Sequence, residues 1–218
     1  MITIPDQQLS KYFKLSDLTK SDSHPDIDNT PSTMYMANLQ NLALMLDQIY
    51  DNLGSFTVNS AYRSPALNAA ISGSSSTSNH MTGQAADIMP DNSTAYDYFL
   101  MLIRSSFLGQ LGQIINETNT SGIVHISLPT SSHPGGQVLY ADDSGYHSYS
   151  TQAVTDLINP PDPTVPVDPT QYIDPTTDVP DTTEGGEDAP SASPVALIML
   201  AGAVFLVIMI LMKSRKNV

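Results

Sequence analysis

Residues 60–88, SAYRSPALNAAISGSSSTSNHMTGQAADI, hold one arginine, one histidine and one aspartate in a run with no other charged side chain. The serine–proline pair near the start predicts a short helix over PALNAAIS, and the glycine and serines that follow predict a polar loop. The segment QAADIM is small and apolar enough for a buried strand. His80 and Asp87 are seven residues apart with Gly83 between them. The chain can therefore turn and bring an imidazole and a carboxylate toward one point.

A third metal ligand is available in the apolar segment GIVHISL, which contains His125. The chain has no cysteine, so any metal must be held by histidine and carboxylate side chains. A His, Asp, His set leaves the fourth tetrahedral position open, as catalytic zinc requires. Each residue also has an ordinary alternative: His125 as a core histidine, Asp87 as a cap or turn residue, and His80 as a surface residue. His133, in the loop SSHPGGQ, is an alternative ligand.

The rest of residues 1–158 predicts helices mixed with strands. An apolar stripe predicts an amphipathic helix over residues 34–53, which Gly54 ends, and a second helix is expected after a cap at Asn92 or Ser93. The segment SFTVNS alternates as a strand, while GQIIN and GIVHISL predict two strands joined by the turn ETNTSG. We therefore expect an α+β fold, with a small antiparallel sheet flanked by helices.

The C-terminal quarter has a different composition. Residues 159–193 contain 8 prolines and 8 acidic residues with no basic residue, which predicts a disordered, extended linker. The uncharged run VALIMLAGAVFLVIMILM is long enough for one transmembrane helix. The predicted organisation is a folded domain, an acidic Pro/Thr-rich linker, a transmembrane helix and a basic tail, at residues 1–158, 159–193, 194–212 and 213–218.

Charge bears on partners and on topology. With a formal net charge of -14, the chain is a poor candidate for nucleic-acid binding, and peptide or glycan partners are expected instead. The basic tail KSRKN favours a cytoplasmic C-terminus with the domain on the other side. The N-terminal residues MITIPDQQLSKYFK lack the apolar core of a secretory signal, so the two topology signals conflict.

Several separated motifs resemble the zinc D-Ala-D-Ala peptidase family, the peptidoglycan carboxypeptidases and endopeptidases of bacteria and phages. The pattern S-x-H-x-x-G-x-A-x-D falls on Ser78, His80 and Asp87, and the strand V-H-I-S contains His125. The opening YFKLSDLTKSD and the DN.P step also look like phage-type members, so the resemblance spans about residues 10–130. It implies the Hedgehog-like α+β fold of that family.

The resemblance implies a role for each matched residue. His80, Asp87 and His125 are implied as zinc ligands. Arg63, in the Y-R-S step, is implied as the cation that faces a substrate carboxylate or the developing oxyanion, and Ser78 lies in the substrate-binding motif.

The catalytic glutamate departs from the pattern of many relatives. Gly122 stands where those relatives have this glutamate, three residues before the last histidine ligand. Phage-type members more often place it further back, where this chain has Glu117, the only glutamate in residues 1–158. A surface glutamate at the end of a strand is the alternative.

The function expected from this resemblance is hydrolysis of peptide bonds in peptidoglycan stem peptides or cross-links by a membrane-anchored zinc peptidase. The enzyme would be a D,D-carboxypeptidase or an endopeptidase, encoded by a virus or phage for entry or lysis. We expect it in the virion membrane or the host cytoplasmic membrane, with the catalytic domain toward the cell wall. The alternative is a non-catalytic, zinc-stabilised module that binds the cell wall.

Overall fold

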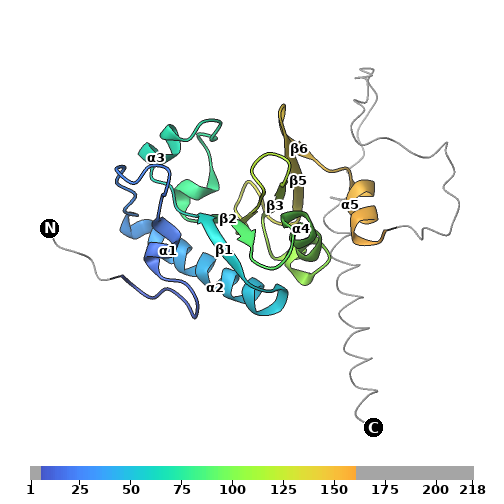
Figure 1. The fold of residues 1–218 in the computed structure, drawn as a ribbon, viewed down its shortest axis with the longest axis horizontal. Helices are drawn as coiled ribbons and strands as arrows, with labels where there is room; N and C mark the ends of the chain where they lie inside the picture. The colour runs from blue at the N-terminus through green and yellow to red at the C-terminus, as the bar shows by residue number, and fades with distance from the viewer. Residues whose placement is uncertain (1–5, 161–218) are drawn as a thin grey trace, which may run out of the picture. The chain divides into compact units, whose positions relative to one another are not determined.

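The computed structural model describes residues 6–160 (Figure 1). The predicted transmembrane helix and basic tail, and the predicted linker from residue 161 onward, lie outside these residues. Within residues 6–160, no helix combines the length and the apolar character needed to cross a membrane. The described chain divides into a compact unit that ends at Ser148 and a second unit that begins at Tyr149 and contains helix α5 (Thr151–Ile158).

A six-stranded sheet forms the centre of the first unit, with the strand order β1-β2-β4-β3-β5-β6. Neighbouring strands are antiparallel except β3 and β5, which run parallel, so the sheet is mixed and the expectation of a purely antiparallel sheet was wrong. The strands are β1 (Phe56–Ser60), β2 (Ala85–Pro90), β3 (Gln113–Glu117), β4 (Ile123–Ser127), β5 (Gln137–Asp142) and β6 (Gly145–Ser148).

The parallel pair arises where the chain crosses back beside the start of β3. After β4, residues 128–136 return to this end of the sheet, where Gly136 N–H donates to Leu111 O at 2.9 Å and Gln137 N–H donates to Gly112 O at 3.1 Å. On the other side, Gly112 N–H donates to Ser127 O at 2.8 Å. A Cβ atom at position 112 would lie 2.5 Å from Leu128 O. The crossing therefore requires a residue without a side chain.

The helices agree largely with the local sequence signals. Helix α2 (Met36–Leu53) ends at Gly54, whose φ of 107° suits glycine. Helix α4 (Ala95–Ile103) is capped by Thr94, whose hydroxyl accepts from Asp97 N–H, so the expected cap at Asn92 or Ser93 was one or two residues early. The remaining helices of the first unit are α1 (Leu15–Thr19), η1 (Thr33–Tyr35), α3 (Pro65–Ala70), η2 (Asn79–Thr82) and η3 (Ser106–Gly109).

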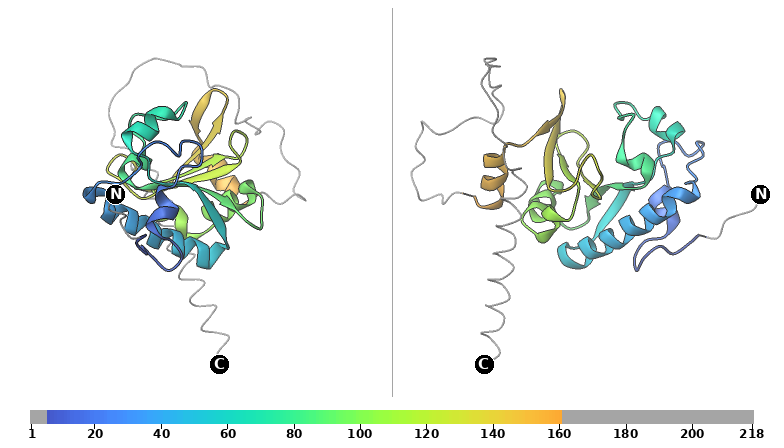
Figure 2. Two further views of the ribbon diagram at one scale, coloured as in Figure 1. Left: turned by 60° about the vertical axis from the view of Figure 1, so that its left-hand side comes forward. Right: turned by 180° about the vertical axis from the view of Figure 1, so that it is seen from behind.

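The sheet has two chemically different faces. One face, here called the core face, is apolar, and α4 contacts it on β2, β3 and β4. In Figures 1 and 2, α2 and α4 lie on one side of the unit, and α3 lies on the other. The strand register fixes the core-face residues as Val58, Ile88, Val124, Ile126 and Ile114.

The opposite face, here called the site face, carries polar side chains among apolar ones. The register places Ser60, Asp87 and His125 side by side on it, because Ser60 pairs with Asp87 and Asp87 pairs with His125. Ile115 pairs with His125, and Glu117 lies two residues further along β3, so Glu117 is on this face too.

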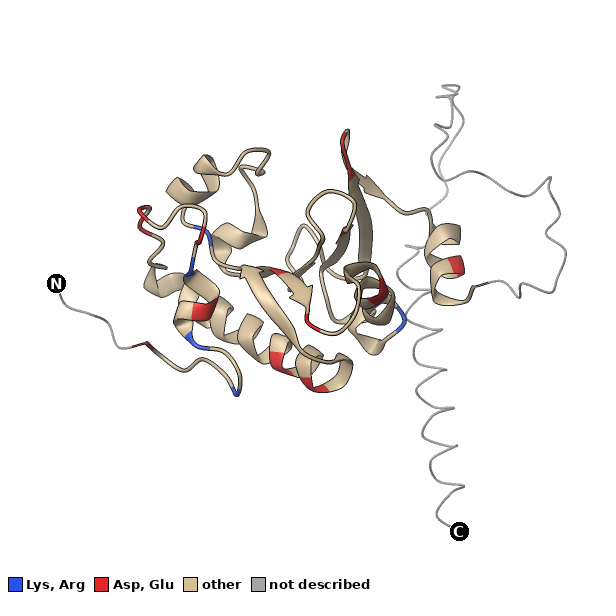
Figure 3. Cartoon of the chain, in the orientation of Figure 1, with Lys and Arg blue, Asp and Glu red and all other residues tan. Residues whose placement is uncertain are grey.

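Figure 3 shows that acidic positions are spread over helices, loops and strands, while lysine and arginine are few.

Candidate metal centre

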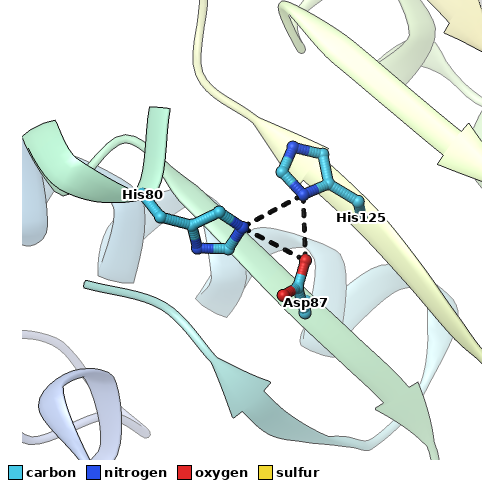
Figure 4. Close-up of side chains that lie close together, drawn as sticks. All are labelled: His80, Asp87 and His125. Atoms are coloured by element: carbon cyan, nitrogen blue, oxygen red, sulfur yellow. Dashed lines mark hydrogen bonds and ion pairs between the residues drawn. The ribbon is translucent and has the colours of Figure 1, made fainter. Parts of the chain in front are cut away.

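Three side chains from separate elements meet on the site face (Figure 4). His80 comes from η2, Asp87 from β2 and His125 from β4, and these side chains belong to residues that are only 2%, 4% and 8% exposed. Asp87 Oδ1 lies 2.9 Å from His125 Nδ1 and 3.2 Å from His80 Nε2, and the two ring nitrogens are 3.2 Å apart. The structure thus brings together the three residues that the sequence suggested.

The triangle of ligand atoms fits a zinc ion. Tetrahedral zinc with ligand distances of 2.0–2.2 Å holds neighbouring ligand atoms roughly 3.3 Å apart. The observed separations of 2.9–3.2 Å are close to this value, and one oxygen and two nitrogens form a donor set that zinc prefers. Because three protein groups converge among residues 6–160, a fourth position is left for water or substrate.

The local sequence explains how His80 reaches the ligand position. Ser78 caps η2, because its hydroxyl accepts a hydrogen bond from His80 N–H at 3.3 Å. The Ser78 hydroxyl therefore has a structural role in the motif. Gly83 ends η2 with φ of 69°, a left-handed conformation that a side chain disfavours. His80 Nδ1 lies 2.6 Å from Ala61 O. A proton on Nδ1 makes this contact a hydrogen bond and leaves the lone pair of Nε2 for a metal.

Arg63 lies behind the ligand carboxylate. Its Nη2 donates to Asp87 Oδ2 at 2.5 Å and its Nε donates to Ser60 Oγ at 2.9 Å. These bonds hold Asp87 with its other oxygen, Oδ1, toward the two imidazoles. Hydrogen-bond partners of metal ligands commonly orient the ligands in this way. The sequence suggested a cation that faces the substrate, and the observed contact with Asp87 was not foreseen. A role of Arg63 toward substrate stays a prediction.

Burial and charge set the ionisation of the ligands. Burial lowers the pKa of His80, which favours the neutral imidazole that binds metals. Burial alone would raise the pKa of Asp87, but the two imidazoles outweigh it and the pKa falls below the ordinary value of 3.8. The carboxylate of Asp87 is therefore ionised and the neutral imidazole of His80 is favoured, which are the forms that bind zinc.

Glu117 ends β3 beside this centre. Its backbone oxygen accepts from the N–H groups of Thr120, Ser121 and Gly122, so the chain turns tightly between Glu117 and β4. Gly122 allows this turn with φ of 72°. The carboxylate is half-buried, and loss of water, followed by the charge of Asp87, raises the pKa of Glu117 above 4.5. The tight turn explains how a glutamate eight residues before His125 in the sequence shares its face of the sheet.

Tyr146 is a site residue that sequence reasoning missed. It lies on β6, and its hydroxyl donates to Glu117 Oε1 at 3.3 Å. The Asp, Ser and Gly residues within VLYADDSGYHSY signal a turn, but the pairing of β5 with β3, which places the hairpin at the site, has no local signal. His133 is not among the three grouped ligands and instead lies 3.4 Å from Ser132 Oγ through Nδ1.

Comparison with known proteins gives one family match. The model of the family described as Peptidase M15 matches residues 11–127, which include His80, Asp87, His125 and Glu117. No curated protein matches the chain.

Proposed function

The chain belongs to the Peptidase M15 family of zinc-dependent peptidases, whose substrate is peptidoglycan, and we propose that it hydrolyses peptide bonds in peptidoglycan stem peptides or cross-links. The observation that supports this proposal is the buried His80, Asp87 and His125 cluster within the matched residues. Such an enzyme would be a D,D-carboxypeptidase or an endopeptidase.

The ligands and their partners prepare the site for the ion. His80 Nε2, Asp87 Oδ1 and His125 Nδ1 would hold zinc, and the Ala61 carbonyl and the Arg63 guanidinium fix the orientation of two of these groups. When bound, zinc acts as a Lewis acid that makes water more acidic and polarises the scissile carbonyl.

Proton transfer is assigned to Glu117. An ionised carboxylate at this position takes a proton from the attacking water and then gives it to the leaving amine, so the proton is conserved across the reaction. The raised pKa of Glu117 makes its carboxylate a stronger base toward the attacking water. Arg63 is proposed to contribute its charge to the developing oxyanion, in addition to its contact with Asp87.

Hydrolysis of purified muropeptides by the full-length protein tests the proposal. Glu117→Gln keeps the shape of the side chain and cannot accept the proton, so we expect bound zinc and a loss of most turnover. Asp97→Asn is the matched control, because it neutralises an exposed carboxylate on α4, at the core-face side of the sheet. Zinc binding without any hydrolysis by the unmodified protein would favour the alternative, a zinc-stabilised module that binds the cell wall.

We also propose that residues 195–212 anchor the protein in a virion or host cytoplasmic membrane, with the catalytic domain toward the wall. The uncharged run and the basic residues after it support this proposal, and the resemblance to phage-type members supports a virus or phage origin with a role in entry or lysis. Protease treatment of membranes or intact particles should release the domain by cleavage within residues 159–193. A domain protected in intact cells and absent from particles would contradict this localisation.

A further inference from the structure

The hairpin of β5 and β6 adds a side chain to the site from outside the family-matched residues. The match ends at residue 127, whereas β6 spans Gly145–Ser148. Ile115 of β3 pairs with Leu139 of β5, and Ala141, two residues further along β5, pairs with Tyr146. This register places Tyr146 on the site face, on the same side of the sheet as Glu117.

Both oxygens of the Glu117 carboxylate are held by hydroxyl groups. Tyr146 Oη donates to Oε1 at 3.3 Å, and Ser121 Oγ donates to Oε2 at 3.2 Å. Ser121 belongs to the turn that follows β3, while Tyr146 reaches the same carboxylate from a strand 29 residues away in the sequence. Tyr146 is 59% exposed, so burial in the core does not explain why its hydroxyl is directed at this group.

The chemistry of this contact favours one ionisation state of the glutamate. A hydroxyl that donates to a carboxylate stabilises the anion, and the bonds from Ser121 and Tyr146 act against the burial and the Asp87 charge that raise the pKa of Glu117. Loss of water and the charge of Glu117 raise the pKa of Tyr146 to about 12. Tyr146 therefore keeps its proton and remains a donor throughout the pH range in which a peptidase works.

We propose that Tyr146 is a positioning residue that holds the Glu117 carboxylate in orientation and keeps it ionised. This inference rests on the proposed function, because it gives the proposed general base a partner. It assigns a role in the reaction to the β5–β6 hairpin, which lies beyond the matched residues.

The test is Tyr146→Phe in the full-length protein, because this change removes the hydroxyl and keeps the ring. Loss of one long and exposed hydrogen bond predicts that kcat falls about fivefold to tenfold, with little change in KM. The acid limb of the pH profile should move upward by about half a pH unit to one unit. Tyr96, an exposed tyrosine on α4, provides the matched control. Tyr96→Phe should leave kcat and the acid limb of the pH profile unchanged. An unchanged acid limb in Tyr146→Phe would overturn the proposal, even if kcat falls.

A measurement without turnover separates this inference from the proposed function. The full chain has only three glutamates, Glu117, Glu184 and Glu187, so carbon-13 labelling of glutamate gives few carboxyl signals in NMR. Tyr146→Phe should raise the pKa of Glu117 in the metal-free protein, whether or not the protein hydrolyses muropeptides. An unchanged pKa of Glu117 would overturn the inference and leave the proposed function intact. Absence of zinc-dependent hydrolysis in the unmodified protein would overturn the proposed function and leave the effect of Tyr146 on the pKa of Glu117 intact.

Discussion

Gly112→Ala should strongly destabilise the fold, because this residue precedes β3 and lies between the ends of β4 and β5. Its N–H donates to Ser127 O and its carbonyl accepts from Gln137 N–H, so backbone lies on both sides. A Cβ atom would lie 2.5 Å from Leu128 O and 2.9 Å from His133 O. Ordinary contacts of a Cβ atom begin at 3.4 Å, so the first carbonyl would have to move by about 0.9 Å. Both obstacles are backbone atoms, which a change of rotamer cannot relieve.

The expected loss of unfolding free energy is about 3 kcal/mol, the upper part of the usual range for overpacking, because two backbone segments must shift. With a urea m-value of about 2 kcal/mol/M, the midpoint should fall by about 1.5 M. Circular dichroism in urea measures this, with a chelator present so that zinc binding does not contribute.

Gly73→Ala is the control for that experiment. Gly73 has φ of 77°, and no atom lies within 4 Å of the position that a Cβ atom would take there. Only backbone strain is therefore expected, at about 1 kcal/mol or a midpoint shift of about 0.5 M. If Gly112→Ala lowers the midpoint no more than Gly73→Ala does, the argument from the strand crossing is refuted.

Three further predictions concern the site. His80→Ala and His125→Ala should lose zinc in elemental analysis, whereas His133→Ala should keep it; full zinc occupancy in the first two variants would exclude the proposed ligands. The Ser127 hydroxyl is buried without a hydrogen-bond partner within residues 6–160. Ser127→Ala should therefore change the unfolding free energy in urea by less than about 0.5 kcal/mol or stabilise the protein. A loss above about 1 kcal/mol would contradict this prediction. In the metal-free protein the pKa of Glu117 should lie above 4.5. Zinc should lower this pKa, because a nearby cation favours the carboxylate. If NMR shows no downward shift on zinc addition, Glu117 does not lie near the bound zinc.

Local patterns predicted much of the fold and the metal cluster. The helix that became α2 has an apolar stripe, β1 alternates, and β2–β4 are short apolar runs between turn signals. Motif spacing identified His80, Asp87 and His125 as a group. These features depend on residues close together in sequence or on a motif shared with the Peptidase M15 family. That dependence explains why a single sequence was enough to find them.

The β5–β6 hairpin was not predicted, because its strongest determinant is distant in the sequence. Strand β6 is four residues long and alternates between half-buried and exposed positions, so it lacks the apolar face that marks a strand. The parallel pairing of β5 with β3 depends on the crossing at Gly112, which no local pattern specifies. Without that pairing, nothing placed Tyr146 beside Glu117.

The contact of Arg63 with Asp87 shows a second limit. A motif indicates that a cation is needed near the site, but a guanidinium has several donors and can serve a ligand, a substrate or both. The placement of Ser60 and Asp87 side by side on the site face, where both accept hydrogen bonds from Arg63, fixes the direction of the side chain.

The position of β6 at the edge of the sheet has a consequence for how such enzymes diversify. The proposed metal ligands come from β2, β4 and η2, while β6 pairs with β5 alone. Residues 137–148 can therefore change in length or sequence during evolution, or be exchanged by design, without moving a ligand strand. An exchange that changes Tyr146 would remove one of the two hydroxyl groups that contact the Glu117 carboxylate. If Tyr146 has the proposed role, the hairpin is a separable module through which the rate and pH range of the site can be adjusted.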